Sequence, residues 1–232
     1  MALISFDDVT VTAPAIGGDV VILREVSATL TEHRIGFIGG NGSGKSTLAR
    51  LINGLVVPSS GRVTVDGLDV TKDGPAVRRH VGFAFTNPAA QLVMPTVAED
   101  VALSLRRHLP DKTARAQRTN EVLEEFGLAA HAGSSVHSLS GGQQQLLALA
   151  GVLATEPTIV VADEPTTLLD LRNSAIVAER LFGLAQQLVL VTHDLDLARR
   201  CDRVLVIAGG RVDFDGEPAA AVEHYRNSVT SS

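Results

Sequence analysis

Aromatic residues and long apolar runs are both scarce in this sequence. Aromatics make up 3% of the 232 residues, with one tyrosine and no tryptophan. A bilayer-spanning helix needs roughly 18 consecutive apolar residues, and the longest apolar run, Leu146 to Ala154, is shorter and interrupted by Gly151. The N-terminus lacks the basic start, apolar run and cleavage site of a signal peptide. These absences favour a globular domain outside the bilayer.

Cysteine is rare, and the chain has no excess of basic charge. The single cysteine, Cys201, excludes an internal disulfide and fits a reducing compartment, and no Cys/His spacing indicates a zinc site. A formal net charge of -6 argues against general nucleic-acid binding, which requires a basic face. With 45% hydrophobic residues the chain can bury a sizeable core as one domain. We therefore expect a cytoplasmic globular domain without a nucleic-acid partner.

Short β-branched runs alternate with longer amphipathic stretches, which predicts an α/β fold. Strands are expected at residues 3–11, 20–30, 34–39, 61–65, 81–85, 158–162, 188–191 and 203–208. The first two should be antiparallel, and Asp66-Gly67 should form a turn. Helices are expected at residues 97–107, 113–126, 171–184 and 194–200, with a short one after Gly216. The simplest organisation is a sheet core, residues 1–86 and 155–232, with a helical insertion at about 87–154.

A glycine-rich segment matches the phosphate-loop pattern G-x-x-x-x-G-K-[ST] between an expected strand and helix. It consists of Gly39, Gly40, Asn41, Gly42, Ser43, Gly44, Lys45 and Ser46, followed by Thr47. Glycines allow successive N–H groups to wrap a phosphate at a helix N-terminus. Lys45 would reach the β- and γ-phosphates, and the Ser46 hydroxyl would bind Mg²⁺. The alternative is a glycine-rich turn with a solvated lysine.

An acidic pair, Asp163-Glu164, directly follows the apolar run 159–162. A buried parallel strand reads as a continuous apolar run, and ligands bind at its carboxyl end. Asp163 would hold Mg²⁺ in the Walker B role, and Glu164 would take a proton from the water that attacks the γ-phosphate. The alternative is that Asp-Glu-Pro only begins a helix.

A second glycine-containing segment opens the apolar helix expected at 146–153. It reads Leu139, Ser140, Gly141, Gly142 and Gln143. Ser140 with Gln143 forms a capping-box pattern, so helix initiation is one complete explanation. Two consecutive glycines exceed what a cap requires, because glycine weakens helices. The other interpretation is that bare N–H groups of this helix must approach an anion closely.

This segment resembles the signature motif of ATP-binding-cassette (ABC) ATPases, and other motifs of that family stand in the same order around it. Gln91 resembles the Q-loop glutamine, Leu168-Leu169-Asp170 the D-loop, and His193 the switch histidine. The resemblance covers nearly the whole chain. It implies one ABC ATPase domain over residues 1–232, with the P-loop NTPase fold. That fold has a mixed central sheet, an N-terminal antiparallel β-subdomain and an inserted α-helical subdomain.

The resemblance also implies a mechanism, with ATP and Mg²⁺ as cofactors. Two ATPase domains would meet head to tail, each ATP lying between the phosphate loop of one and the signature segment of the other. The partner would be a second copy of this chain or a related subunit. Glu164 would be the general base, His193 would position the water, Gln91 would touch Mg²⁺ or the water, and Asp170 would bridge the subunits. From the residues alone, a histidine at a strand end such as His193 is more often structural, and a loop glutamine such as Gln91 is usually polar surface. Asp170 could equally be a helix N-terminal carboxylate.

One position departs from the family pattern. The family stacks adenine on an aromatic residue near the first hairpin, but here that region contains Ala13. Few aromatic residues are available as a substitute. This puts base selectivity in doubt, but not triphosphate binding.

Residues 87–101, which read NPAAQLVMPTVAEDV, resemble the Q-loop of energy-coupling-factor (ECF) ATPases. Those ATPases take up vitamins or transition metals with a transmembrane coupling protein and a substrate-binding membrane protein, on the cytoplasmic face of the membrane. The apolar centre, Leu92, Val93 and Met94, would suit a groove that receives a coupling helix, although it could equally pack inside the domain. The short length resembles the biotin-uptake ATPase, which makes biotin the favoured substrate.

Two other classes of protein compete with the importer. Soluble ABC ATPases in DNA repair carry a long coiled coil, but only about 90 residues separate Lys45 from Ser140, and those in translation carry two cassettes. A regulator without turnover would lack Glu164 or His193, and both are present. We therefore expect an ATP-hydrolysing importer subunit.

Overall fold

The structure is a computed structural model that describes residues 1–230, and the chain forms two compact units. The first contains Met1–Val81, Thr158–Glu164 and the residues from Leu184 onward; the second contains Gly82–Pro157 and Pro165–Gly183. The division expected from sequence assigned all of 155–232 to the core. Pro165–Gly183 instead belongs to the second unit, because its helix packs against a helix of that unit.

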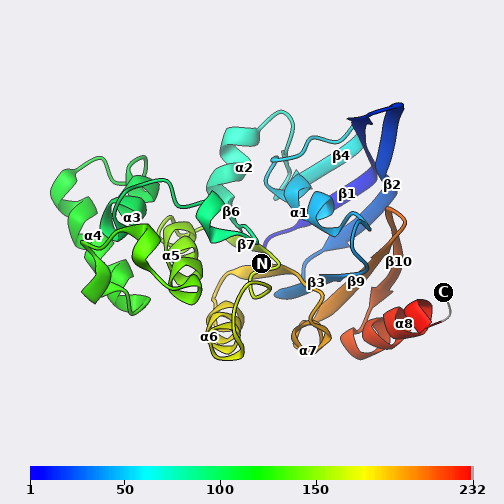
Figure 1. Ribbon diagram of the computed structural model, residues 1–232. Coiled ribbons are helices and arrows are strands. Elements are labelled where there is room, and N and C mark those ends of the chain that lie inside the picture. The colour runs from blue at the N-terminus through cyan, green and yellow to red at the C-terminus, as the bar shows by residue number, and fades with distance from the viewer. Residues whose placement is uncertain (231–232) are drawn as a thin grey trace. The chain divides into compact units, whose positions relative to one another are not determined.

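An antiparallel sheet opens the first unit, as expected (Figure 1). Its strands are β1 (Ile4–Ala15), β2 (Gly18–Leu30), β4 (Ser60–Val65) and β5 (Leu68–Asp69), in the order β2-β1-β4-β5. Gly17 and Gly18 turn the β1–β2 hairpin with φ of 107° and 125°, which glycine adopts readily. Asp66 and Gly67 turn the chain from β4 to β5, also with positive φ.

A second, mixed sheet forms the core of the first unit. Its strands there are β3 (Arg34–Ile38), β7 (Ile159–Asp163), β8 (Gln187–Val191), β9 (Arg203–Ala208) and β10 (Arg211–Gly216), in the order β10-β9-β3-β8-β7. Every residue of β3, β7 and β8 is buried, as continuous apolar runs of a parallel sheet predict. Strand β10 was not expected from sequence, because it is a half-exposed, polar edge strand. Strand β6 (Val81–Ala84) begins at the last residue of this unit's first segment.

Helices cover both sides of this core (Figure 1). Helix α1 (Lys45–Ile52) contacts β2 and β4 of the antiparallel sheet as well as β7 and β8, so it lies between the two sheets. Helix α7 (Leu195–Ala198) packs on β3, and α8 (Pro218–Thr230) packs on β9 and β10. Helix α2 (Gly74–His80), which the sequence analysis did not anticipate, contacts β5. The buried face of α1 fixes the start of that helix, where the phosphate loop ends.

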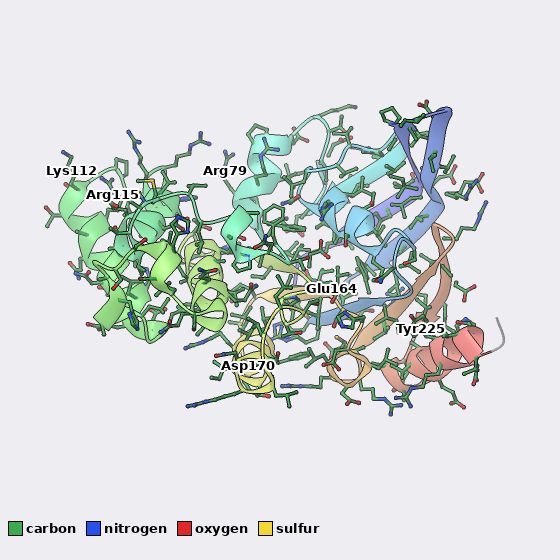
Figure 2. The ribbon with its side chains drawn as sticks, in the orientation of Figure 1. Arg79, Lys112, Arg115, Glu164, Asp170 and Tyr225 are labelled. Carbon is green, nitrogen blue, oxygen red and sulfur yellow. The ribbon has the colours of Figure 1, made fainter. Side chains whose placement is uncertain are left out.

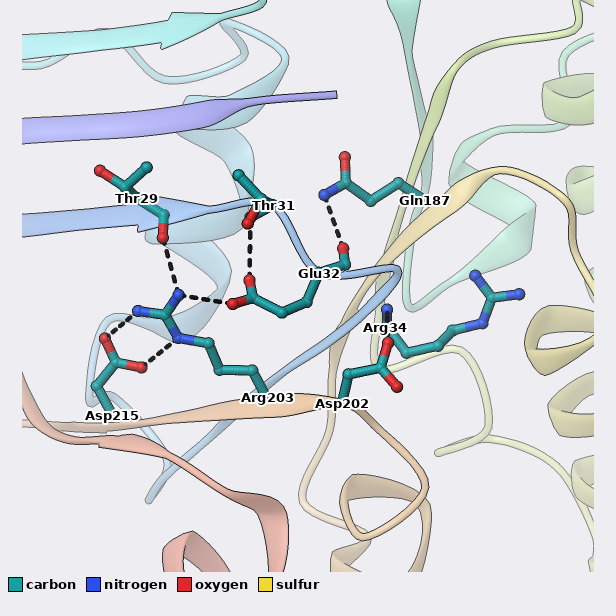
Figure 3. A network of polar contacts seen from close by, with 8 residues as sticks. All are labelled: Thr29, Thr31, Glu32, Arg34, Gln187, Asp202, Arg203 and Asp215. Atoms are coloured by element: carbon teal, nitrogen blue, oxygen red, sulfur yellow. Dashed lines mark hydrogen bonds and ion pairs between the residues drawn. The ribbon is translucent and has the colours of Figure 1, made fainter. Parts of the chain in front are cut away.

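A polar network ties the strand ends of the first unit together (Figure 3). The Arg203 guanidinium donates to both carboxylate oxygens of Asp215 at 2.6 and 2.7 Å, and also to Glu32 at 3.0 Å. These two acidic partners raise the pKa of Arg203, and Gln187 donates to the Glu32 carbonyl at 2.8 Å. A bidentate pair of this kind holds β9 and β10 in a fixed geometry.

The second unit is mostly helical. Its helices are α3 (Val97–Leu105), α4 (Lys112–Glu125), α5 (Gly141–Leu153) and α6 (Leu171–Phe182), with 3-10 turns at Pro88–Ala90, Ala129–His131 and Val136–Ser138. Side-chain caps begin each of the four α-helices, including a full capping box from Thr96 and Glu99 at α3. Over residues 1–230, no helix combines the length and apolar character that crossing a bilayer demands.

Candidate nucleotide-binding site

Three loops of the first unit meet at one edge of the parallel sheet. In the sheet register Phe37 and Asp163 both pair with Val191, so β3, β7 and β8 end at the same level. The phosphate loop follows β3, Glu164 follows β7, and His193 follows β8. This is the edge at which α/β sheets bind ligands.

The phosphate loop requires glycine at two positions for reasons seen in the structure. Gly39 and Gly44 have φ of 147° and 105°. A Cβ on Gly39 would lie 2.1 Å from the carbonyl oxygen of Ile207, and one on Gly44 would lie 2.7 Å from the Leu23 side chain. Gly44 is also the N-cap of α1. It has no side chain to accept from the first N–H groups of the helix, so these groups remain open to an anion.

Lys45 is buried and lies within its own loop. Its Nζ donates to the carbonyl oxygens of Gly39 and Gly40, both at 2.9 Å. Burial lowers the pKa of Lys45, while the nearby carboxylates of Glu164 and Asp163 act in the opposite direction. The ammonium is therefore held by carbonyls at the centre of the loop, where a phosphate oxygen can replace them as its partner.

Ser46, directly after Lys45, forms a hydrogen bond with Asp163. The Ser46 hydroxyl donates to Oδ1 of Asp163 at 2.8 Å, and Arg50 lies 3.2 Å from Oδ2. Asp163 is fully buried, and its burial raises the pKa of the carboxyl despite these two partners. Arg50 was missed from sequence, although its i, i+4 spacing from Ser46 places both on one face of a helix.

The donor set at this point fits Mg²⁺. A hydroxyl and a carboxylate are hard oxygen ligands, and Mg²⁺ is usually held by one or two carboxylates together with substrate phosphates. In the part of the chain that the structure describes, no three His, Cys, Asp or Glu side chains cluster as a complete metal cage. The residues present therefore suit a cation that shares its ligands with a nucleotide.

Glu164 and His193 also meet at this edge (Figure 2 labels Glu164). Oε2 of Glu164 lies 2.7 Å from Nδ1 of His193. Glu164 has φ of 51°, a left-handed conformation that costs a non-glycine residue about 1–3 kcal/mol. Its N–H donates to the Val191 carbonyl at 2.9 Å, which holds the strained residue in place. In this conformation the Glu164 carboxylate lies beside the histidine ring.

A cavity of about 400 Å³ lies between the phosphate loop and Glu164. Its lining consists of Ile22, Asn41, Gly42, Ser43, Gly44, Lys45, Ser46, Thr47 and Glu164. Ile22, from β2, was not expected from sequence, since only the tertiary fold brings it beside the loop. Ala13, where the family pattern has an aromatic residue, pairs with Val20 in the β1–β2 hairpin and supplies no ring.

The candidate residues of the second unit are arranged differently. Ser140 is the N-cap of α5: its hydroxyl accepts from the Gln143 N–H at 3.3 Å, and its own N–H donates to the Gln143 side chain at 2.9 Å. The predicted capping box is therefore confirmed. The two glycines differ, because a Cβ on Gly142 would lie 2.4 Å from the Asn173 side chain, whereas one on Gly141 would meet nothing closer than 3.9 Å. Close packing thus accounts for Gly142, and Gly141 is exposed.

Asp170 and Gln91 are also satisfied within the second unit. Asp170, labelled in Figure 2, caps α6 by accepting from the N–H and the side-chain amide of Asn173 at 2.8 and 2.9 Å. Gln91 accepts from the Phe85 N–H at 3.3 Å and donates to the Ala148 carbonyl at 3.1 Å. Beside it, Val93 is exposed, Met94 half-buried and Leu92 buried, so the apolar centre of this loop is divided between surface and interior.

Comparison with known proteins decides the family. The family model described as "ABC transporter" matches residues 23–167, well over half of the chain. The chain belongs to the ABC transporter family. It is an ATPase of the kind that couples hydrolysis to transport, and ATP is its nucleotide. The phosphate loop and the Asp163-Glu164 pair lie within the matched ABC region.

Several curated relatives of this ABC ATPase align over most of its length. A putative ABC transporter ATP-binding protein of Bartonella quintana is 46% identical over 97% of this chain and 98% of its own. A biotin transport ATP-binding protein BioM of Rhizobium etli is 45% identical over 89% and 92%. An energy-coupling factor transporter ATP-binding protein EcfA1 of Halalkalibacterium halodurans is 40% identical over 80% and 68%. These names do not favour a soluble ATPase of DNA repair or translation.

Solved structures confirm the predicted ABC ATPase fold. The ATP-binding cassette MJ0796, in a dimeric post-hydrolysis state bound to ADP and phosphate, matches with a TM-score of 0.83 at 29% identity, over 93% of this chain and 98% of that one. CbiO1 of Clostridium perfringens, part of the ABC transporter complex cbiONQ, matches with a TM-score of 0.81 at 28% identity, over 98% and 93%.

Proposed function

We propose that this protein is the ATPase subunit of an ECF-type importer, that it dimerises on ATP at the cytoplasmic face of the membrane, and that biotin is the transported substrate. The observation that carries the ATPase chemistry is the meeting of the phosphate loop, Asp163 and the Glu164–His193 pair at one sheet edge. The importer type and the substrate are supported by the names of the relatives, above all BioM at 45% identity.

In the proposed reaction the first unit binds and orients the triphosphate. The loop N–H groups and the start of α1 face the phosphates, and Lys45 exchanges its carbonyl partners for phosphate oxygens. Ser46 and Asp163 would hold Mg²⁺, which would neutralise charge on the phosphates. In this proposal Gln91 also touches Mg²⁺ or the water and relays the state of the nucleotide to the membrane partner.

The water-activating group in this proposal is Glu164. Its carboxylate lies at the cavity wall, 2.7 Å from the His193 ring, and only a sixth of the Glu164 side chain is exposed. A positioned carboxylate can take a proton from water, and an adjacent imidazole can orient that water against the γ-phosphate. The pair thus performs two tasks, proton transfer and positioning, with two neighbouring side chains.

The second copy of the chain completes the site. Ser140 and Gly141 of that copy are exposed at the start of α5, where N–H groups can face an anion, and its Asp170 bridges the two copies. Both halves of the site occur in one chain, so a symmetric homodimer builds two equal sites. A related ATPase subunit could take the same position. Membrane partners would be a coupling protein and a substrate-binding protein, and exposed Val93 supports a docking point for the former.

The test of the ATPase assignment is Glu164→Gln, which keeps the size of the side chain and removes the base. The variant should bind Mg·ATP, lose at least about a hundredfold in hydrolysis rate, and elute as a dimer on gel filtration with Mg·ATP. Glu223→Gln, the same substitution at an exposed position on α8, is the matched control and should hydrolyse ATP at the wild-type rate.

Two results would contradict separate parts of the proposal. ATP hydrolysis by the Glu164→Gln variant at the wild-type rate would contradict the assignment of Glu164 as the general base. If the Glu164→Gln variant binds Mg·ATP but stays monomeric, the ATP site shared between two copies would be contradicted. The transport assignment is tested apart from these, by co-purifying the protein with its membrane partners and measuring uptake of radiolabelled biotin into vesicles.

A further inference from the structure

Arg50 contacts Asp163, the carboxylate that the proposed function assigns to Mg²⁺. It lies in the last turn of α1, one helical turn after Ser46. Its Nη2 is 3.2 Å from Oδ2 of Asp163, while the Ser46 hydroxyl is 2.8 Å from Oδ1. A hydroxyl and a guanidinium from the same helix face thus approach the two oxygens of one buried carboxylate.

This ion pair differs from the structural pair elsewhere in the first unit. Arg203 donates two hydrogen bonds of 2.6 and 2.7 Å to Asp215, and its side chain is 24% exposed. Arg50 has one longer contact to Asp163, its side chain is 41% exposed, and its buried Nε has no hydrogen-bond partner among the described residues. A single contact can be released more readily than a bidentate one.

A divalent cation and Arg50 make opposing demands on Asp163. Both carry positive charge, and at contact distance in a partly buried site they repel each other strongly. Without phosphate oxygens the protein offers few other ligands, because the described residues contain no group of three acidic, histidine or cysteine side chains that could hold a metal ion. A cation at Asp163 would therefore compete with the Arg50 guanidinium, and the protein alone offers it few other ligands.

We propose that Arg50 is a positioning residue that acts as the resident counter-ion of Asp163 and makes binding of the divalent cation conditional on the nucleotide. The triphosphate supplies the additional ligands and negative charge that let the cation displace the guanidinium, which then turns toward solvent. This inference rests on the assignment of Asp163 to the metal site in the proposed function. It adds that the same carboxylate is blocked against free metal.

The experiment measures Mn²⁺ binding to the full-length protein by electron paramagnetic resonance, without nucleotide and with a non-hydrolysable ATP analogue. Arg50→Gln should bind Mn²⁺ without nucleotide about tenfold or more tightly than wild type, because the competing charge is gone. Arg50→Lys keeps the charge and should stay close to wild type. Arg62→Gln is the matched control, since Arg62 also pairs a half-exposed guanidinium with a buried aspartate, Asp69 at 2.9 Å, away from the site.

Equal Mn²⁺ affinity of wild type and Arg50→Gln without nucleotide would overturn the inference. Asp163→Asn separates this from the proposed function. If Asp163→Asn weakens nucleotide-dependent Mn²⁺ binding while Arg50→Gln changes nothing, only the inference fails. If Asp163→Asn also changes nothing, the metal site itself is misassigned.

A measurement on the wild-type protein covers the case in which Arg50→Gln does not fold. The Nε resonance of Arg50, in protein labelled with ¹⁵N-arginine, should shift with Mg²⁺ plus the ATP analogue and not with Mg²⁺ alone. An equal shift with Mg²⁺ alone would contradict the conditional binding.

Discussion

The candidate residues of the two units differ in their burial and in the contacts that they make within one chain. In the first unit, Lys45 and Asp163 are buried and Glu164 is strained, and each faces a partner of the same site. In the second unit, Ser140 and Asp170 are exposed and act as ordinary helix caps. The first unit thus places buried charge and a left-handed backbone at its candidate residues, whereas the second places exposed helix caps at Ser140 and Asp170.

The functional role of a residue is visible in one chain only where that chain alone gives no structural reason for its position. Buried charge and an unfavourable backbone conformation are costly, so they indicate a functional site when, as with Lys45, Asp163 and Glu164, they gather beside a phosphate loop. A helix cap stabilises the protein whether or not it meets a nucleotide. A functional role for Ser140 and Asp170 therefore depends on a second molecule, and experiments on these residues must separate the cap from the contact.

Ser140→Asp gives the largest expected effect on this comparison. Aspartate is as good an N-cap as serine, so the free energy of unfolding should remain close to the wild-type value. Its charge would repel the γ-phosphate of the second copy, and the ATPase rate should fall about a hundredfold or more. Binding of a fluorescent ATP analogue to the monomeric protein should not change.

Ser140→Ala is the complementary variant. It removes the cap without adding charge, so it should lose about 1 kcal/mol of stability and less activity than Ser140→Asp. Wild-type hydrolysis by Ser140→Asp would limit this serine to its structural role, and the two units would then differ even more than proposed.

The adjacent glycines give a smaller effect, on stability. Gly142→Ala should lower the free energy of unfolding by about 1–3 kcal/mol, since the new methyl group would overlap the Asn173 side chain. In Gly141→Ala the new methyl group would meet nothing closer than 3.9 Å, so stability should change by no more than about 0.5 kcal/mol. Urea denaturation followed by circular dichroism measures both. Equal losses for the two variants would contradict the packing explanation of Gly142.

Cys201 provides the smallest effect and an independent probe of the first unit. Burial raises the pKa of its thiol to about 12, so the native protein should resist iodoacetamide at pH 8 and react only on opening. Gly142→Ala, in the other unit, should change the labelling rate by less than about twofold if the units open separately. Labelling of the native protein at the rate of a free thiol would refute the burial.

The same thiol gives the sign of a pH effect. The folded protein retains the thiol proton up to about pH 12, whereas the ordinary pKa of the group is 9.0. The unfolded chain therefore releases this proton first, and the contribution of Cys201 to stability falls as pH rises from 9 toward 12. Below pH 9 that contribution is constant.

The sequence by itself determined the phosphate loop, the buried strands and the α5 capping box. Their determinants are consecutive residues: glycines around Lys45, an apolar run before Asp163, and the Ser140–Gln143 spacing. Such patterns act through backbone conformation and local hydrogen bonds, which need no knowledge of distant parts of the chain. For the same reason the sequence could not reveal β10, a polar edge strand whose pairing with β9 is its main support.

Only the tertiary structure decided which distant residues share a site. The order of β3, β8 and β7 brings the phosphate loop, Asp163 and His193 to one edge, and the packing of α1 brings Arg50 to the same carboxylate. Tertiary packing also decided that Gly142 faces Asn173 and that Ile22 borders the cavity. These contacts join residues far apart in the chain, and they depend on strand order and helix docking, which no local pattern of side chains encodes.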